Sequence, residues 1–371
     1  MDTELLEEKI GEAPIGIEDK HPRGDGMDGD RKRSPSDLRK RFRPVEFFAE
    51  YGIKAVSFTS FAVIILIFVF VFREAMPVFS HREKTAVDQE ELQQETYGDD
   101  SSDPAPATKS GTDANEGVAS LENLSGPEWQ PVSSEPKYGL LPLFVGSFKV
   151  TMISVLVGAP LAILAALFTA VFAPPWLKKL LKPTIEFLAG FPSVVIGFFA
   201  LVEMATLFQE LFGYQYRLNA FVGGIALSLA VIPVIYTVTD DALSAIPKHL
   251  SEASLALGAT RWQTGLFVIL PAALPGVFAA VLLGVGRAFG ETMIVLMATG
   301  NATLMSWKIF EPVRTLSATI GAEMAEVVFG DTHYNVLFLI GALLFIITFA
   351  LNAIAEFYVR DRLIKRLQGG A

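Results

Sequence analysis

The sequence predicts an all-α polytopic membrane protein with six transmembrane helices, and three observations support this fold class. The chain has 371 residues, is 51% hydrophobic and has a mean hydropathy of +0.42, values that soluble proteins of this length rarely reach. Charged residues make up only 19% of the chain and are concentrated in 1–54 and 76–138. The remainder consists mostly of apolar runs with the length that a membrane-crossing helix needs.

The N-terminal part is expected to form a polar tail and a first helix. Residues 1–54 are rich in charged residues, Gly and Pro with few aromatic residues, which predicts a disordered cytoplasmic tail. A transmembrane helix is expected over 55–75, because Ala55 to Phe72 is an uncharged apolar run behind a basic flank. A cleaved signal peptide is not expected, because the run lies far from the N-terminus and no small-residue cleavage site follows it.

A hydrophilic periplasmic loop is expected over 76–140. Its section 76–138 holds 13 acidic and four basic residues, and its Gly, Ser, Asp and Pro content is typical of a mobile linker with at most a small ordered element at its ends. A transmembrane domain follows over 141–360, and residues 361–371 form a C-terminal tail. Apolar runs predict its five spans at about 147–173, 184–208, 219–239, 268–300 and 335–358.

Glycine and proline interrupt several of these spans. The fifth is long and glycine-rich, which favours a broken or tilted helix. Helix-breaking residues also occur at 158–160, at 190–192 and at Pro233. Either membrane helices are simply richer in Gly and Pro, or these breaks border a cavity where neighbouring groups satisfy the freed backbone.

The placement of lysine and arginine predicts the orientation in the inner membrane. Basic residues gather before the first span, in the loop 174–182, in the segment 240–263 and after residue 359. The intervening loops carry fewer. Both termini and the segment 240–263 are therefore expected in the cytoplasm, and 76–138 is expected outside.

Composition excludes several classes of function. The chain has no cysteine, so it has no disulfide, zinc–thiolate site or thiol nucleophile, and its four histidines show no metal-ligand spacing. No Gly-Lys dipeptide occurs, so any ATP must be bound by another chain. There is no basic face for nucleic acid, and no residue set suggests covalent catalysis or a cofactor. We therefore expect a protein that is not an enzyme.

The segment 240–271 is too polar to span and predicts a short cytoplasmic helix over about 247–259. Pro247 suits the first turn of a helix, and Gly258 occupies the place of a left-handed residue that ends one. Beyond Gly258 the chain should turn and enter the fifth span through Trp262. A short helix in this place would offer a surface for another protein.

This segment resembles the EAA motif of the permeases of ABC importers. The motif has Glu-Ala-Ala, then Gly, then an aliphatic residue and Leu-Pro, and the spacing here is the same, with Val268 as the aliphatic residue and Ser254 in place of the second Ala. The resemblance implies a type I ABC importer permease fold, in which this loop is the coupling helix that docks on a cytoplasmic ATPase. The implied coupling residues are Glu252, Ala253, Ser254, Gly258, Leu270 and Pro271.

The stretch 285–294, GRAFGETMIV, places an arginine and a glutamate inside an apolar run. Arg287 and Glu291 are four residues apart and are expected on one helix face. An arginine at the bilayer centre costs roughly 2.5–3.5 kcal/mol on insertion scales, so the pair should face the protein interior or a wet pathway. Either Glu291 neutralises Arg287 in a structural lock, or Arg287 offers its guanidinium to an oxyanion that crosses the membrane.

Three stretches resemble the phosphate-specific ABC permeases of the Pst system, and the chain is similar to the PstC-like subunit. They are 256–301, FLAGFPSVVIGFFAL at 187–201 and FEPVRTLSATIGAEMAE at 310–326. The resemblance implies that Arg287, Glu291 and Thr292 lie on the substrate pathway. It also implies a PstA-like permease subunit, two copies of a cytoplasmic ABC ATPase and a periplasmic phosphate-binding protein as partners.

Other functions stay open on the sequence alone. The Arg-to-Glu element also resembles sulfate and molybdate permeases, so a permease for sulfate, molybdate or tungstate is an alternative. A secondary transporter would use the segment 240–271 as a plain connector and need no ATPase. A membrane-bound enzyme or sensor would require a folded ligand-binding unit within 76–138.

Overall fold

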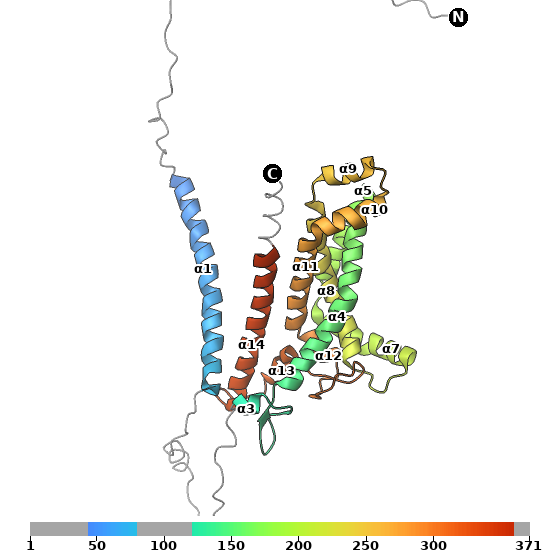
Figure 1. Ribbon diagram of the computed structural model, residues 1–371. Helices are drawn as coiled ribbons and strands as arrows, with labels where there is room; N and C mark the ends of the chain where they lie inside the picture. Colours follow the sequence, from blue (N-terminus) through green and yellow to red (C-terminus); the bar gives the residue numbers. More distant parts are fainter. Residues whose placement is uncertain (1–43, 80–120, 360–371) are drawn as a thin grey trace, which may run out of the picture. The chain divides into compact units, whose positions relative to one another are not determined.

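A computed structural model describes residues 44–79 and 121–359 (Figure 1). The described residues contain six helices that are long and apolar enough to cross a membrane, so the all-α fold with six spans is confirmed. Their bounds are Tyr51–Val78, Leu141–Phe172, Ser193–Phe212, Ala220–Ser244, Arg261–Gly290 and Thr332–Phe357. Residues 1–43 of the predicted tail, 80–120 of the predicted loop and the tail 361–371 lie outside the described residues.

The first span is α1 (Pro44–Ala75), which runs into the 3-10 turn η2 (Met76–Val78). The helix begins at Pro44 and not at Ala55, because proline suits the first helical position and the following residues, although some are charged, are compatible with a helix. Chain contacts divide the protein after Phe61, within α1, so residues 44–61 are described only as a helix. Residues 121–138 form α3 (Leu121–Leu124) and an antiparallel hairpin of β1 (Trp129–Gln130) and β2 (Lys137–Tyr138).

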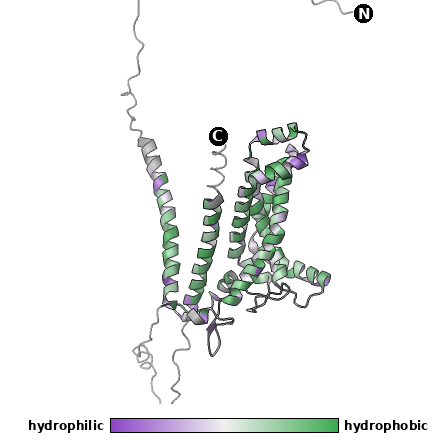
Figure 2. Ribbon diagram, in the orientation of Figure 1, coloured by the Kyte–Doolittle hydropathy of each residue, from purple (hydrophilic) through white to green (hydrophobic). Residues whose placement is uncertain are grey.

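Most of the second unit is helical. Its helices are α4 (Leu141–Leu167), α5 (Pro175–Ala189), α6 (Ser193–Phe199), α7 (Ala205–Phe212), α8 (Ala220–Ser244), α9 (Lys248–Ala256), α10 (Arg261–Gln263), α11 (Leu270–Gly290), α12 (Met293–Ala298), α13 (Leu316–Glu323) and α14 (Thr332–Ile354). Four π-helical segments adjoin them: η3 (Phe168–Phe172), η4 (Ala200–Met204), η5 (Thr264–Ile269) and η6 (Ala355–Val359). Figure 2 shows hydrophobic residues along most of α4, α11 and α14.

The centre of this unit is the packing of α4 against α8. Gly158 on α4 lies so close to α8 that an added Cβ would stand 3.4 Å from the Cβ of Ser228. Gly224 on α8 packs in the same way against the side chain of Ile153. Small residues allow this close approach, which membrane helices use in place of a hydrophobic driving force. Pro160 and Pro233 lie inside these two helices without ending them.

The third span differs from its predicted range of 184–208. The chain first forms the separate helix α5, turns at Gly190, and begins the spanning helix α6 after Pro192, whose backbone is extended (ψ 132°). A residue before a proline avoids the helical region, and Pro192 itself cannot donate to the preceding turn. The break that the sequence showed at 190–192 therefore ends one helix and starts another.

A second hydrophobic cluster lies at the end of the unit opposite α9, where Figure 1 shows α3, α13 and the start of α14. It joins Ala75 and Val78 to α3, the hairpin and α14. Trp129 and Tyr138 are each 3% exposed, and both ring systems pack near His333. The end of the predicted loop therefore does carry a small ordered element.

A polar network around Glu323 joins the hairpin, α13 and α14 within this cluster. The Glu323 carboxylate accepts hydrogen bonds from Trp129 Nε1 (3.2 Å) and pairs with His333 Nε2 (2.9 Å) and with the Arg314 guanidinium. Arg314 Nε in turn donates to Asn301 Oδ1 (3.0 Å). Burial alone would raise the pKa of Glu323, but hydrogen bonds from His333 and Trp129 and the charge of Arg314 outweigh it and hold the pKa below its ordinary value.

Glu323→Gln is expected to destabilise the protein by on the order of 3 kcal/mol near neutral pH, because Arg314 would lose its carboxylate in a largely buried place. The carboxyl pKa is lower in the folded than in the unfolded protein. Its stabilising contribution is therefore complete above the unfolded pKa and is lost as the pH falls through the folded pKa. The difference in melting temperature between wild type and variant, measured on purified protein, should shrink as the pH is lowered below the ordinary carboxyl pKa. A difference that stays constant would contradict this role of Glu323.

Candidate functional site

The predicted short helix is present as α9, and its end confirms the expected role of Gly258. Gly258 adopts a left-handed backbone with φ +86°. Its N–H donates to Leu255 O (3.0 Å), and the Ala259 N–H donates to Ser254 O (3.2 Å). These two bonds form a Schellman motif, which satisfies carbonyls that a helix end leaves free. Pro247 precedes the helix as its N-cap.

The α9 surface is open. Glu252, Ala253 and Gly258 are exposed, and no residue of the helix is buried. Leu257, directly after the helix, is 89% exposed. This apolar side chain extends the accessible surface of the helix end. The sequence analysis missed Leu257, although an apolar residue next to the expected helix end was the available signal.

The remaining predicted coupling residues do not lie on the exposed surface of α9. Ser254 turns toward the protein, and its Oγ lies 3.0 Å from Thr264 Oγ1, which is buried. Leu270 and Pro271 start α11 and follow the π-helical segment η5, so they lie beyond α10 and outside α9. Pro271 has no N–H to bond the preceding turn, which fits the altered helix just before it.

Arg287 lies in the last turn of α11 and is exposed. Its Nε donates to Ala230 O of α8 (3.3 Å), and the structure gives no partner among the described residues for its two terminal nitrogens. α11 ends at Gly290, where an added Cβ would meet no atom within 4 Å. The guanidinium therefore stands beside a helix end with two of its donor groups unused.

Glu291 and Arg287 do not share a helix face, so this expectation was wrong. Glu291 follows the end of α11 with an extended backbone (φ −71°, ψ 128°), and α12 begins at Met293. No ion pair joins the two side chains in the described part of the chain. The spacing of four residues implies a common face only while the helix continues, and Gly290 ends it. The break in the fifth span is as expected.

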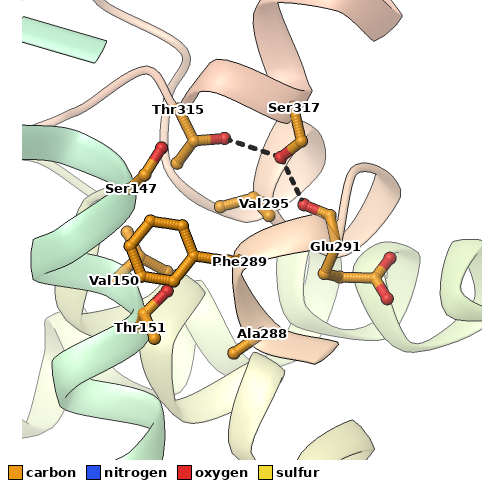
Figure 3. A pocket seen from close by; sticks show the side chains of 9 residues that line it. All are labelled: Ser147, Val150, Thr151, Ala288, Phe289, Glu291, Val295, Thr315 and Ser317. Atoms are coloured by element: carbon orange, nitrogen blue, oxygen red, sulfur yellow. Dashed lines mark hydrogen bonds between the residues drawn. The ribbon is translucent and has the colours of Figure 1, made fainter. Parts of the chain in front are cut away.

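A small pocket lies at this break (Figure 3). Ser317 Oγ donates to the backbone carbonyl of Glu291 (2.7 Å) and lies 3.2 Å from Thr315 Oγ1. Ser147 and Thr151 of α4 bring two further hydroxyl groups to the pocket wall. In Figure 3 the Glu291 carboxylate points away from the Phe289 ring and its backbone carbonyl points toward Ser317. Sequence patterns carry no signal for this set, because its residues come from three separate segments.

Thr292 and Lys149 are two further polar residues, and their surroundings differ. Thr292 Oγ1 makes one long contact, 3.5 Å from Gly290 O, so its hydroxyl has weak protein partners. Lys149, which lies on α4, is buried and donates to Ser306 O (2.7 Å) and Lys308 O (2.9 Å). It therefore holds the loop before α13. Within the described ranges no group of three or more His, Asp or Glu side chains could hold a metal ion.

An arrangement of spanning helices, a broken helix with a cation at the break and an open connecting helix is that of a membrane transport component. The family model of the binding-protein-dependent transport system inner membrane component matches residues 158–364. The chain belongs to this family. It is an ABC importer permease, a multi-pass protein of the inner membrane and not an enzyme, and the ATPase is a separate chain.

Two relatives each match more than half of the chain. The probable ABC transporter permease protein YqgH of Bacillus subtilis is 41% identical over 233 residues, which is 63% of this chain and 75% of the relative. The phosphate transport system permease protein PstC of Mesorhizobium japonicum is 32% identical over 253 residues, covering 63% and 76%. A structure of the inward-facing MetNI methionine ABC transporter matches with a TM-score of 0.47 and 22% identity, over 60% of this chain and 95% of that chain.

Proposed function

We propose that this chain is the permease subunit of an ATP-driven inorganic phosphate importer and forms half of its translocation pore. The observation that carries the proposal is the exposed Arg287, whose two terminal nitrogens have no partner among the residues that the structure describes. A guanidinium fork matches the oxygens of phosphate in two parallel hydrogen bonds. The name of the PstC relative supports phosphate, whereas that of YqgH gives no substrate.

The neighbours of Arg287 fit a site that binds an anion briefly. Thr292 offers a hydroxyl with only one long protein contact, which could donate to a phosphate oxygen. Glu291 lies between the end of α11 and the start of α12. Its negative charge would oppose prolonged retention of an anion. A translocation site must bind its solute weakly enough to release it.

The proposed partners follow from the open α9 surface and the family. Glu252, Ala253 and Gly258 would contact one copy of a cytoplasmic ABC ATPase, with Leu257 as an apolar anchor. A PstA-like permease subunit would supply the second half of the pore and bind the second ATPase copy. A periplasmic phosphate-binding protein would deliver the substrate. ATP-driven closure of the ATPases would move α9 and switch the pore between outward and inward access.

The proposed contact between α9 and a cytoplasmic ATPase determines the orientation of the chain in the membrane. α9 and both chain termini would lie in the cytoplasm, in agreement with the basic residues of the loop 174–182 and of the segment 240–263. The hairpin 129–138 and α13 would then lie on the periplasmic side.

The test is radiolabelled phosphate uptake by cells that express the complete transporter and lack other phosphate uptake. We expect saturable uptake that excess unlabelled phosphate competes away and that sulfate, molybdate and tungstate leave unchanged. Loss of uptake when one of these other oxyanions is added would assign the permease to that anion. Uptake that persists without ATP and follows an ion gradient would identify a secondary transporter.

A further inference from the structure

α5 is a short helix between two spanning helices, and its lysines have different partners. Lys178 Nζ donates to Ala170 O (2.8 Å), a carbonyl of the preceding segment η3. Lys182, one turn further on, lies 3.4 Å from Asp240 Oδ2 and 3.5 Å from Asp241 Oδ1. The Lys178 contact stays with the span that directly precedes α5. The Lys182 contact reaches a span later in the chain, because both aspartates belong to α8.

The Lys182 contact compensates a buried charge. The Asp240 side chain is only 9% exposed, and Lys182 is its one ion-pair partner among the described residues. Thr239, close by on α8, has a hydroxyl group without a hydrogen-bond partner in the described part of the protein. Burial lowers the pKa of Lys182, but the hydrogen bond and charge of Asp240, together with Asp241, outweigh it and raise the pKa, so the lysine stays charged.

The Lys182 contact connects two parts of the candidate site. One part is the end of α8 next to α9, and the other is the helix break before α12, which α5 reaches through α6. Asp240 and Asp241 lie in the last turns of α8, which ends at Ser244 just before α9. α5 is followed, after a turn at Gly190, by α6. Gly197 of α6 packs against α12 so closely that an added Cβ would stand 3.0 Å from Met293 O. α12 begins directly after the helix break at Glu291.

We propose that Lys182 is a positioning residue that transmits movement of α9 through α5 and α6 to α12 and the helix break. The inference rests on the proposed function, in which an ATPase moves α9. When α9 moves with the end of α8, the ion pair obliges α5 to follow. α6 continues from α5, and its close backbone contact shifts α12. Coupling of this kind requires a contiguous set of packed elements, and the contacts above form one.

The test uses the complete transporter with its ATPase, partner permease and binding protein in proteoliposomes, where ATP hydrolysis and phosphate uptake are measured together. For Lys182→Gln we expect the phosphate transported per ATP hydrolysed to fall by about five-fold or more, while hydrolysis continues. Lys182→Arg keeps a charge within reach of both aspartates and should restore the ratio. Lys178→Gln is the matched control on the same helix and should leave the ratio unchanged.

Asp241→Asn provides a second variant, because its side chain is 67% exposed and its loss leaves no buried charge without a partner. We expect a smaller fall in the same ratio. An unchanged ratio in Lys182→Gln, or in Asp241→Asn where the first variant fails to assemble, would overturn the inference. Equal loss of transport and hydrolysis would show a purely structural contact and also overturn it. Failure of the proposed function is distinguishable, because the wild-type transporter would then not import phosphate.

Discussion

Replacing Arg287 with alanine is expected to reduce phosphate uptake by about 100-fold or more while the chain still reaches the membrane and assembles. Hydrogen bonds to charged groups contribute about 1.5–3 kcal/mol each, and the guanidinium would offer phosphate two of them. The folded protein should lose little stability, because the side chain is exposed and its one recorded bond, to Ala230 O, is long. The measurement is radiolabelled uptake normalised to the amount of protein in the membrane.

A matched control exists in Arg217. It is likewise exposed and likewise donates to a backbone carbonyl, Leu201 O (2.7 Å), but it lies in the connection between α7 and α8. Arg217→Ala should leave uptake near the wild-type rate. Normal uptake in the Arg287→Ala variant would show that Arg287 has a structural role and that the anion path lies elsewhere.

Replacing Gly258 with valine is expected to separate the permease from its ATPase and stop uptake. Gly258 has φ +86°, a region that a β-branched residue adopts only with strain of about 1–3 kcal/mol. The chain would relieve this strain by abandoning the Schellman bonds from Gly258 and Ala259 to the end of α9. The helix end, with the exposed Leu257, would then change direction. Copurification of the ATPase and phosphate uptake are the two measurements.

The control for this substitution is Gly213→Val. Gly213 ends α7 with φ +68° and, like Gly258, has no atom within 4 Å of an added Cβ. The local strain is therefore similar, but the helix end is a different one. We expect Gly213→Val to retain the ATPase and to import phosphate. A Gly258→Val variant that keeps both the ATPase and uptake would exclude α9 as the docking helix.

The sequence was sufficient where local chemistry decides the structure. The number of spans follows from the length of the apolar runs, because each membrane helix satisfies its backbone within itself. The end of α9 at Gly258 was also predictable, because a glycine after a helical segment is the residue that accepts the left-handed backbone without strain. The proposed roles of the coupling and pathway residues remain predictions that the experiments above address.

The details of the break were out of reach because distant residues determine them. Ser317, on a separate helix, donates a hydrogen bond to the backbone carbonyl of Glu291. The residue pattern of the stretch 285–294 does not predict that contact. The partners of Lys149 are equally distant in sequence, because two carbonyls of the loop before α13 accept hydrogen bonds from its amine inside the protein. Contacts between segments far apart in the chain cannot be predicted from the hydrophobic or polar pattern of either segment.

The second hydrophobic cluster, opposite α9, determines where this chain can accept inserted residues. Val78 and Leu124, on either side of the segment 80–120, are buried in the same hydrophobic cluster. The ends of the segment are thus fixed by the packing around them, whatever its length. Each doubling of the length of a connection between fixed ends adds only about 0.6 kcal/mol of closure entropy. We therefore expect this position to accept an inserted affinity tag or fluorescent reporter with little loss of stability.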